Sequence, residues 1–258
     1  MNLKKIYKYG SPPNFYRFVM KLEPWCLSLG LLLIAMKLEP WCLSLGLLLI
    51  AIGSIGGLFI APKDYQMGDA FRIIYFHVPS AYLSMSAYAA MGIASIIGIV
   101  WRSNVAFAVA KSIAPFGALM TAVALITGML WGKPMWGTAW VWDARLTSEF
   151  ILLLLYLGYI ALHATIKEQK RADRAASLLA ILGIVNLPII HYSVVWWNTL
   201  HQASTISKLD SPSIVGEMLW PLLLMIIGYM IFFVGVICRG GSAEVLMREK
   251  RSNWVKEV

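Results

Sequence analysis

The sequence predicts an all-α integral membrane protein with six transmembrane helices. Of the residues, 59% are hydrophobic and only 14% are charged, and the mean hydropathy is +0.70. This composition is typical of polytopic membrane proteins and excludes an ordinary soluble domain. The 258 residues provide room for six spans of about 20 residues each, joined by short loops. No large soluble domain fits beside them.

The first predicted span includes most of the second copy of a duplicated segment. The 16 residues at 20–35, MKLEPWCLSLGLLLIA, recur unchanged at 36–51. The first copy offers an apolar helix of only about 18 Å, and we expect Lys37, Glu39 and Pro40 to end it. The second copy continues without a charge over Trp41–Ile60, which is long enough to cross a bilayer. We therefore expect the first copy to lie on the cytoplasmic side or at the interface.

Five further apolar runs complete the set of spans. They are predicted at Ala81–Trp101, Ile113–Leu130, Phe150–Ile166, Leu178–Trp197 and Leu219–Cys238. The chain is thus divided into a basic N-terminal segment (1–40), a six-helix membrane domain (41–238) and a basic tail (239–258).

The distribution of basic residues predicts the orientation in the membrane. The loops at 61–80, 131–149 and 198–218 hold only 5 of the 22 Lys and Arg residues, and the remaining 17 lie in the other loops and the two ends. Positively charged loops stay in the cytoplasm, so we expect both termini there and these three loops outside. The same pattern explains the net charge of +9 without a nucleic-acid partner.

The external segment Trp131–Arg145, WGKPMWGTAWVWDAR, is the most unusual stretch of the chain. Gly132, Pro134 and Gly137 predict an irregular loop rather than a helix. One interpretation is an interfacial aromatic belt. The other is a flat aromatic platform for a large planar ligand, because this short stretch holds four of the chain's 11 tryptophans, Trp131, Trp136, Trp140 and Trp142.

Two of the four histidines share the side of this segment. His77 precedes the second predicted span and His201 follows the fifth, whereas His163 and His191 lie within spans. Neutral imidazoles suit iron, and a low-spin haem iron takes two axial ligands. The alternative is that each loop histidine is merely a polar interfacial residue. His191 is kept as a second-choice ligand, and His163 is interpreted as a side chain that extends to the cytoplasmic surface.

The acid–base pair that closes the aromatic segment also has a predicted role. Arg145 is the favoured partner for the carboxylates of a haem, ahead of the other external basic residues, which are Arg72, Lys133 and Lys208. Asp143 is expected to accept hydrogen bonds from loop N–H groups, an indole or Arg145, and so to hold the platform in place.

Several other activities are excluded by missing motifs. The three cysteines form neither a CxxC pair nor a CxxCH motif, which argues against thiol redox chemistry and covalent haem attachment through cysteine. The sequence also lacks the GxxxxGK[ST] motif of an ATPase.

The segment WGKPMWGTAWVWDARLTSE resembles the WWD signature of the haem-handling proteins of cytochrome c maturation. FHVPSA at 76–81 and WWNTLHQ at 196–202 are similar to the two external histidine segments of that family. The chain length and six predicted spans resemble its smallest branch, haem exporter protein C (CcmC), over about residues 41–240.

This resemblance implies a haem-binding protein of the bacterial inner membrane rather than an enzyme. It implies that haem b is held at the periplasmic face, with His77 and His201 as axial ligands and the WWD loop as platform, and then passed to a periplasmic haem chaperone. The other implied partners are ABC-type ATPase and permease subunits and a small single-span helper protein.

Two other functions are compatible with six apolar spans. A permease for haem or another small solute requires polar residues or broken helices near the midplane, and Asn186–Pro188 is the one such feature. A haem-b electron carrier requires paired histidines inside the spans, yet His163 and His191 lie at opposite ends of theirs.

Overall fold

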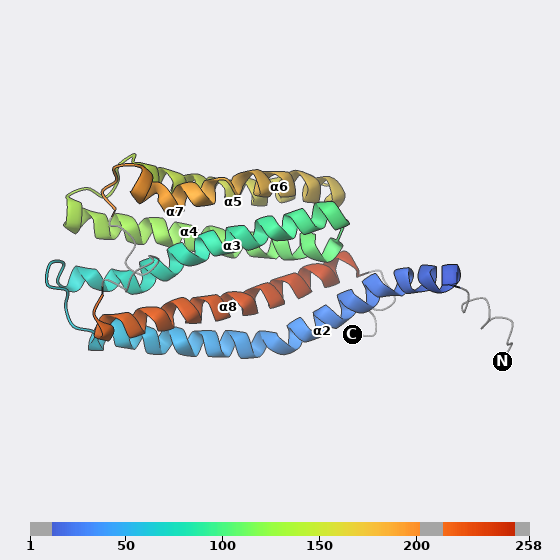
Figure 1. Cartoon of the computed structure of the whole chain (residues 1–258), viewed down its shortest axis with the longest axis horizontal. Coiled ribbons are helices and arrows are strands. Elements are labelled where there is room, and N and C mark those ends of the chain that lie inside the picture. Colours follow the sequence, from blue (N-terminus) through green and yellow to red (C-terminus); the bar gives the residue numbers. More distant parts are fainter. Residues whose placement is uncertain (1–11, 202–213, 251–258) are drawn as a thin grey trace.

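The computed structural model describes residues 12–201 and 214–250, with side chains from residue 33 onward. Long, roughly antiparallel helices lie side by side in an elongated bundle (Figure 1). Six helical segments are long and apolar enough to cross a membrane. The predicted all-α fold class with six spans is therefore confirmed.

Four of the connections between the long helices are short, at residues 102–103, 137–143, 166–168 and 184–185, and two short irregular helical turns flank the first loop. A turn of π-helix occupies Gly56–Ile60 and a 3-10 helix occupies Asp69–Ile73. The long helices are α2 (Pro12–Ile55), α3 (Ile74–Trp101), α4 (Asn104–Trp136), α5 (Ala144–Thr165), α6 (Gln169–Gly183), α7 (Asn186–Trp196) and α8 (Gly216–Arg248).

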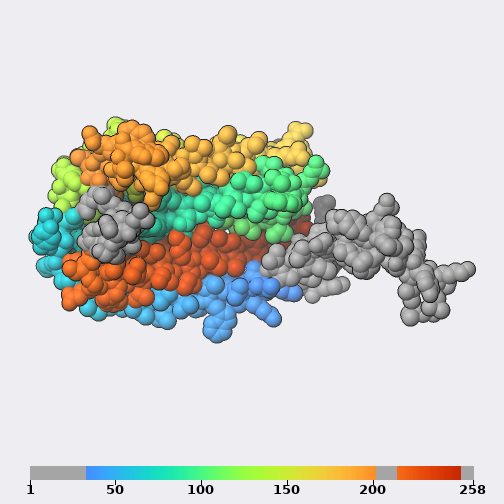
Figure 2. All heavy atoms as spheres, viewed as in Figure 1, coloured from blue at the N-terminus to red at the C-terminus, as the bar shows by residue number. Residues whose placement is uncertain are grey.

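The helices form three layers when the bundle is viewed from the side (Figure 1). Helices α2 and α8 make the outer pair on one side, α3 and α4 lie in the middle, and α5, α6 and α7 cover the other side (Figures 1 and 2). The main buried core lies between the middle layer and α5–α6, and its largest members are Tyr88, Met91, Tyr156 and Tyr159.

Small residues allow α2 and α8 to approach each other closely. A Cβ atom at Gly46 of α2 would lie 2.6 Å from the backbone nitrogen of Phe232, and one at Gly228 of α8 would lie 3.0 Å from that of Ile50. Close backbone approach at glycine is a usual way to hold helices together in lipid, where hydrophobicity alone provides no attraction.

The duplicated segment does not contain the helix end that its sequence predicts. Helix α2 continues through Lys37, Glu39 and Pro40 to Ile55, so the expected break is wrong. The first membrane-crossing stretch is Leu33–Ile60, which includes all of the predicted span Trp41–Ile60. Glu39 lies 3.7 Å from Arg239 of α8, so this part of α2 lies beside its neighbour.

The aromatic segment is also more helical than predicted. Helix α4 continues through Gly132 and Pro134 and ends at Trp136. Pro134 lacks the backbone N–H that would donate to the carbonyl of Leu130, so the last turn forms without this one bond. The true helix end is at Gly137, which adopts φ 74° and donates its N–H to the carbonyl of Lys133 at 3.1 Å. Only residues 137–143 are irregular.

Two further boundaries differ from the sequence prediction. His77 lies in the first turn of α3 and not in a loop, because that helix begins at Ile74. The fifth span consists of two helices, α6 and α7, separated by a turn at residues 184–185. The buried side chain of Asn186 donates to the carbonyl of Ser148 at 2.9 Å, so α5 stabilises this break.

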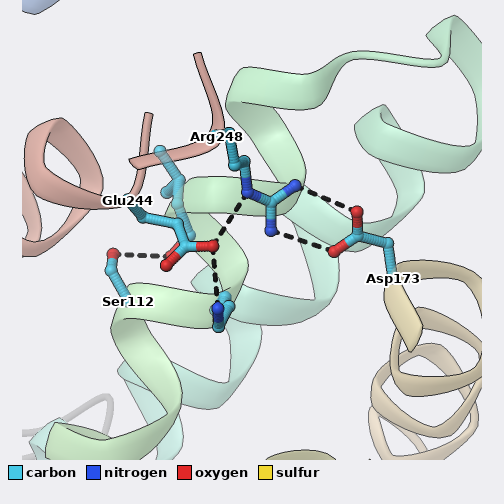
Figure 3. Close-up of polar contacts among 6 residues, drawn as sticks. Ser112, Asp173, Glu244 and Arg248 are labelled. Atoms are coloured by element: carbon cyan, nitrogen blue, oxygen red, sulfur yellow. Dashed lines mark hydrogen bonds and ion pairs between the residues drawn. The ribbon is translucent and has the colours of Figure 1, made fainter. Parts of the chain in front are cut away.

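A buried ion-pair network ties α4, α6 and α8 together at the end of the bundle where α8 finishes (Figure 3). Arg248 binds both carboxylate oxygens of Asp173, at 2.9 and 3.0 Å, and also contacts Glu244 at 2.9 Å. Lys111 reaches the same Glu244 at 2.8 Å. The two positive charges are matched by two negative ones.

Candidate functional site

A cavity opens at the opposite end of the bundle, between the start of α3, the end of α4 and the start of α5. Its empty volume is about 670 Å³ when the part open to solvent is included. Most of the polar side chains named for this site by sequence lie on its wall. The lining includes His77, Trp131, Trp136, Trp140, Arg145, Glu149 and His201.

The two histidines predicted to converge do so. The imidazole centroids of His77 and His201 are 6.1 Å apart and the rings are tilted by 35°. His77 is only 9% exposed, and its ring meets the indole of Trp131 at 5.9 Å. His201 lies 6.4 Å from Trp136. Two imidazoles from segments more than a hundred residues apart thus meet among tryptophans at one cavity.

Three of the four tryptophans line this cavity and the fourth does not. Trp142 is 75% exposed and packs edge-on against Trp140 at 5.2 Å, with Phe150 behind it. The indole N–H groups of Trp131 and Trp140 are buried and have no hydrogen-bond acceptor among the described residues. The cavity wall is therefore largely aromatic.

Asp143 fixes the segment as its sequence position suggested. One carboxylate oxygen accepts from the N–H of Leu146 at 2.8 Å and caps α5. The other accepts from the N–H of Leu200 at 3.3 Å. One side chain therefore joins the aromatic segment to the residue next to His201, and the prediction that Asp143 binds loop N–H groups is confirmed.

Arg145 and Glu149 lie one helical turn apart on α5 and both face the cavity. Arg145 donates to the backbone carbonyl of Ile190 at 2.7 Å, which holds its guanidinium in place. Glu149 is 7% exposed and accepts a hydrogen bond from the hydroxyl of Ser84 at 2.8 Å. The site thus presents a cation next to a buried acidic group.

The other basic candidates do not line the cavity. Arg72 donates to the carbonyl of Gly57 at 2.8 Å and pairs with Asp69 at 3.1 Å. Lys133 is exposed on the last turn of α4. Lys208 lies outside the described residues.

The remaining histidines are placed away from the cavity lining. His191 is exposed on α7 and meets the ring of Tyr192 at 4.7 Å. His163 lies near the other end of α5, 5.0 Å from the ring of Tyr159, and its Nε2 is buried without a hydrogen-bond partner in the described part of the chain. Neither joins the His77–His201 pair.

Three polar residues of the site were missed by the sequence reasoning: Ser84, Thr127 and Glu149. Thr127 lies 3.0 Å from Nδ1 of His77. An acidic residue at the edge of an apolar run, such as Glu149, is a signal for a functional site in a membrane protein. Thr127 and Ser84 gave no comparable signal, because serine and threonine are ordinary residues within spans.

Comparison with known proteins identifies the family of this chain. The model of the CcmC family, heme exporter protein C, matches residues 31–256. The chain belongs to the haem exporter protein C family. The second copy of the duplicated segment lies wholly within the matched residues, whereas most of the first copy precedes them.

Individual relatives extend over nearly the whole chain. A heme exporter protein C of Escherichia coli is 48% identical over 99% of this chain and 96% of its own length. The heme exporter protein C of Haemophilus influenzae is 46% identical, with 99% and 97% covered. A putative cytochrome c biosynthesis ccmC-like mitochondrial protein of Marchantia polymorpha is 44% identical over 69% of this chain and 75% of its own.

Membership of the haem exporter protein C family implies a role in haem handling for cytochrome c maturation. The six apolar spans make this chain a multi-pass membrane protein of that family.

Proposed function

We propose that this member of the haem exporter protein C family binds haem b between His77 and His201 and delivers it to a periplasmic haem chaperone. In this proposal haem is cargo, and the protein is a carrier rather than an enzyme. The observation that carries the proposal is the meeting of the two imidazoles at a tryptophan-lined cavity, 6.1 Å apart.

The spacing of the imidazoles suits a metal placed between them. A coordinating imidazole nitrogen lies about 2 Å from its metal, and the ring centroid lies about 1 Å behind that nitrogen. Two imidazoles on opposite sides of one iron therefore have centroids about 6 Å apart, close to the 6.1 Å between His77 and His201. Among the described residues no group of three or more His, Cys, Asp and Glu side chains forms a metal site. A porphyrin iron needs only two protein ligands, since the ring supplies the other four.

The rest of the lining suits the other parts of a haem. Tryptophan rings bind the edges and faces of a planar aromatic molecule. The side chain of Arg145 lines the same cavity. Carboxylate side chains of the ligand would pair with its guanidinium.

The proposed location is the periplasmic face of the bacterial inner membrane. The cavity lies at the end of the bundle where the loops hold 5 of the 22 Lys and Arg residues. The positive-inside rule places the more basic opposite end in the cytoplasm. The cavity then opens toward the compartment in which a periplasmic chaperone can reach it.

The proposed partners follow from this location and from the family. They are a periplasmic haem chaperone, ABC-type ATPase and permease subunits, a small single-span helper protein and the surrounding membrane lipid. The apolar outer faces of the helices, for example Leu47, Leu48 and Ile97, are exposed, as expected of surfaces that contact lipid or another membrane protein.

The permease alternative loses its main support in the structure. Its sequence signal was the broken span at Asn186–Pro188, yet the amide of Asn186 is bonded to Ser148 and the break lies outside the cavity lining. We therefore treat the break as a structural feature.

Haem transfer between purified components tests the proposal. The protein, loaded with haem in detergent, is mixed with the purified chaperone, and the two are separated by affinity capture. We expect haem to move to the chaperone from the loaded protein and not from a sample of the His77→Ala, His201→Ala double variant incubated with the same haem. The His163→Ala variant is the matched control and is expected to deliver normally. Delivery by the double variant at the parent rate would contradict the proposal.

Transport into sealed vesicles distinguishes the permease alternative. Vesicles containing the protein and an enclosed haem-binding reporter are given haem on the outside. The carrier proposal predicts that the protein does not increase the amount of haem bound by the enclosed reporter. A clear increase would favour a permease.

A further inference from the structure

The contacts of His77 determine which of its ring nitrogens is available to a ligand. His77 lies in the first turn of α3, and its Nδ1 is 3.0 Å from the hydroxyl oxygen of Thr127 on α4. Besides this contact, the His77 ring hydrogen-bonds to the backbone carbonyl of Ala124, which lies in the same turn of α4. A neutral imidazole carries one proton, so the role of the Thr127 hydroxyl bears on which ring nitrogen carries it.

The single hydrogen of the Thr127 hydroxyl is already used. Its oxygen lies 2.6 Å from the carbonyl oxygen of Val123 and 3.2 Å from that of Ala124. A carbonyl oxygen can only accept, so the hydroxyl hydrogen points back along α4, as is usual for threonine inside a helix. The lone pairs of the hydroxyl oxygen remain free to accept from His77.

The packing around the ring fixes its orientation. A Cβ atom at Gly128, the residue after Thr127, would lie 3.2 Å from Cε1 and 3.7 Å from Nδ1 of His77. The Nδ1–Cε1 edge of the imidazole therefore rests against α4 at residues 127–128. A larger side chain at position 128 would push that edge away from Thr127.

We propose that Thr127 is a positioning residue that keeps the proton of His77 on Nδ1 and leaves the lone pair of Nε2 directed to the cargo iron. This inference rests on the proposed function, in which His77 is an axial ligand. A histidine that binds a metal through one nitrogen generally donates the other N–H to a fixed acceptor, and this contact orients the ring and increases its basicity.

Two consequences distinguish this role from simple packing. Without the acceptor, the proton can move to Nε2, where it blocks coordination. In the loaded protein, loss of the hydrogen bond also makes the imidazole a weaker electron donor, which favours the reduced iron and raises its midpoint potential.

The first test uses the protein without haem. Protein labelled with nitrogen-15 in its four histidines is studied by nitrogen NMR, and the His77 signals are assigned as those absent from His77→Ala. We expect His77 to be protonated on Nδ1 in the parent and in Thr127→Ser, which keeps the hydroxyl. Thr127→Val, of nearly the same shape, should shift the proton wholly or partly to Nε2.

The second test uses the haem-loaded protein. Loss of haem to an excess of apomyoglobin should be about 10- to 100-fold faster in Thr127→Val than in the parent, as for other contacts that support a metal ligand. Its midpoint potential should be higher. The matched control is Thr121→Val, because Thr121 makes the same back-bond on α4, to Gly117 at 2.8 Å, without lining the cavity. Thr127→Ser and Thr121→Val should stay within about twofold of the parent.

The inference is overturned if the parent carries the proton on Nε2, or if Thr127→Val leaves both the proton and the haem loss rate unchanged. Should Thr127→Val fail to fold, the NMR of the parent and of Thr127→Ser still shows which ring nitrogen of His77 carries the proton. If the parent binds no haem at all, the proposed function fails, whereas the NMR result still judges the role of Thr127.

Discussion

The carboxylate of Asp143 accepts one hydrogen bond from Leu146 and another from Leu200, at 2.8 and 3.3 Å. The first bond caps α5, and the second fastens the segment that carries His201. The same side chain therefore contributes to helix stability and to the position of a proposed haem ligand, and these two effects can be separated by mutation.

Substitution at Asp143 should separate the two contacts. Asp143→Ser keeps a helix cap but is too short to reach Leu200, so thermal stability should stay close to that of the parent while haem is lost about 2- to 10-fold faster, as expected for one hydrogen bond. Asp143→Ala should lose both the cap, worth about 1 kcal/mol, and haem retention. Equal haem retention in all three proteins would show that the Leu200 contact does not position His201.

The tryptophans should fall into two groups. Replacement of Trp131, Trp136 or Trp140 by alanine removes a cavity wall and should speed haem loss about fivefold each, since a single aromatic contact is worth about 1 kcal/mol. Trp142→Ala is the matched control, because this ring is 75% exposed, and should retain haem like the parent. Absorption spectra and transfer to apomyoglobin provide the measurement. A larger loss for Trp142→Ala than for the other three would contradict this division.

The sequence predicted the site better than it predicted the helix ends. The WWD segment, the two histidines and the charge pattern together predicted where most of the residues that line the cavity lie, because residue type and spacing indicate a binding site. The sequence placed His77 and Trp131 in loops, since a proline or glycine usually breaks a helix. In the bundle, however, α3 and α4 continue through Pro79 and Pro134, since tertiary packing outweighs the loss of single backbone hydrogen bonds.

Contacts between distant segments lay beyond sequence reasoning. Nothing in the sequence pairs Thr127 with His77, or Ser84 with Glu149, because each pair joins two different helices. The outward position of Trp142 could not be predicted either. Four tryptophans in one short stretch cannot be told apart by sequence, and the turn at Gly137 sets the directions of their side chains. Packing of the bundle, rather than local pattern, decides these features.

The orientation in the membrane is tested with reporter fusions. A reporter active only outside the cytoplasm should be active when fused after Asp143 or after His201. It should be silent when fused near Arg171, at the start of α6. Activity at Arg171 would reverse the proposed orientation and place the cavity on the cytoplasmic side.

The ion-pair network at the other end of the bundle should govern stability and not haem binding. Asp173→Ala leaves the buried Arg248, whose side chain is 7% exposed, with Glu244 as its one remaining acidic partner in the described part of the chain. Breaking such a buried pair costs about 3 kcal/mol, so the empty protein should unfold at a clearly lower temperature in detergent. Glu168→Ala is the control, because its partner Arg171 is 80% exposed and such pairs contribute little. An unchanged unfolding temperature for Asp173→Ala would contradict this role.

The duplicated segment offers a simple deletion test. Removal of residues 20–35 leaves the second copy and the whole of Trp41–Ile60, so we expect membrane insertion and haem binding to remain. Membrane fractionation and the absorption spectrum of the deleted protein measure this. Loss of insertion would show that the first copy supplies part of the essential span.

The absorption spectrum of the histidine variants tests the central claim most directly. The purified parent should bind haem b as a six-coordinate, low-spin iron with split visible bands. His77→Ala and His201→Ala should each give a five-coordinate or water-ligated haem, or none, and added imidazole should restore the six-coordinate spectrum. His163→Ala and His191→Ala should match the parent, because neither lines the cavity. If both cavity variants kept the parent spectrum while His191→Ala lost it, the haem would lie elsewhere and the account would be wrong.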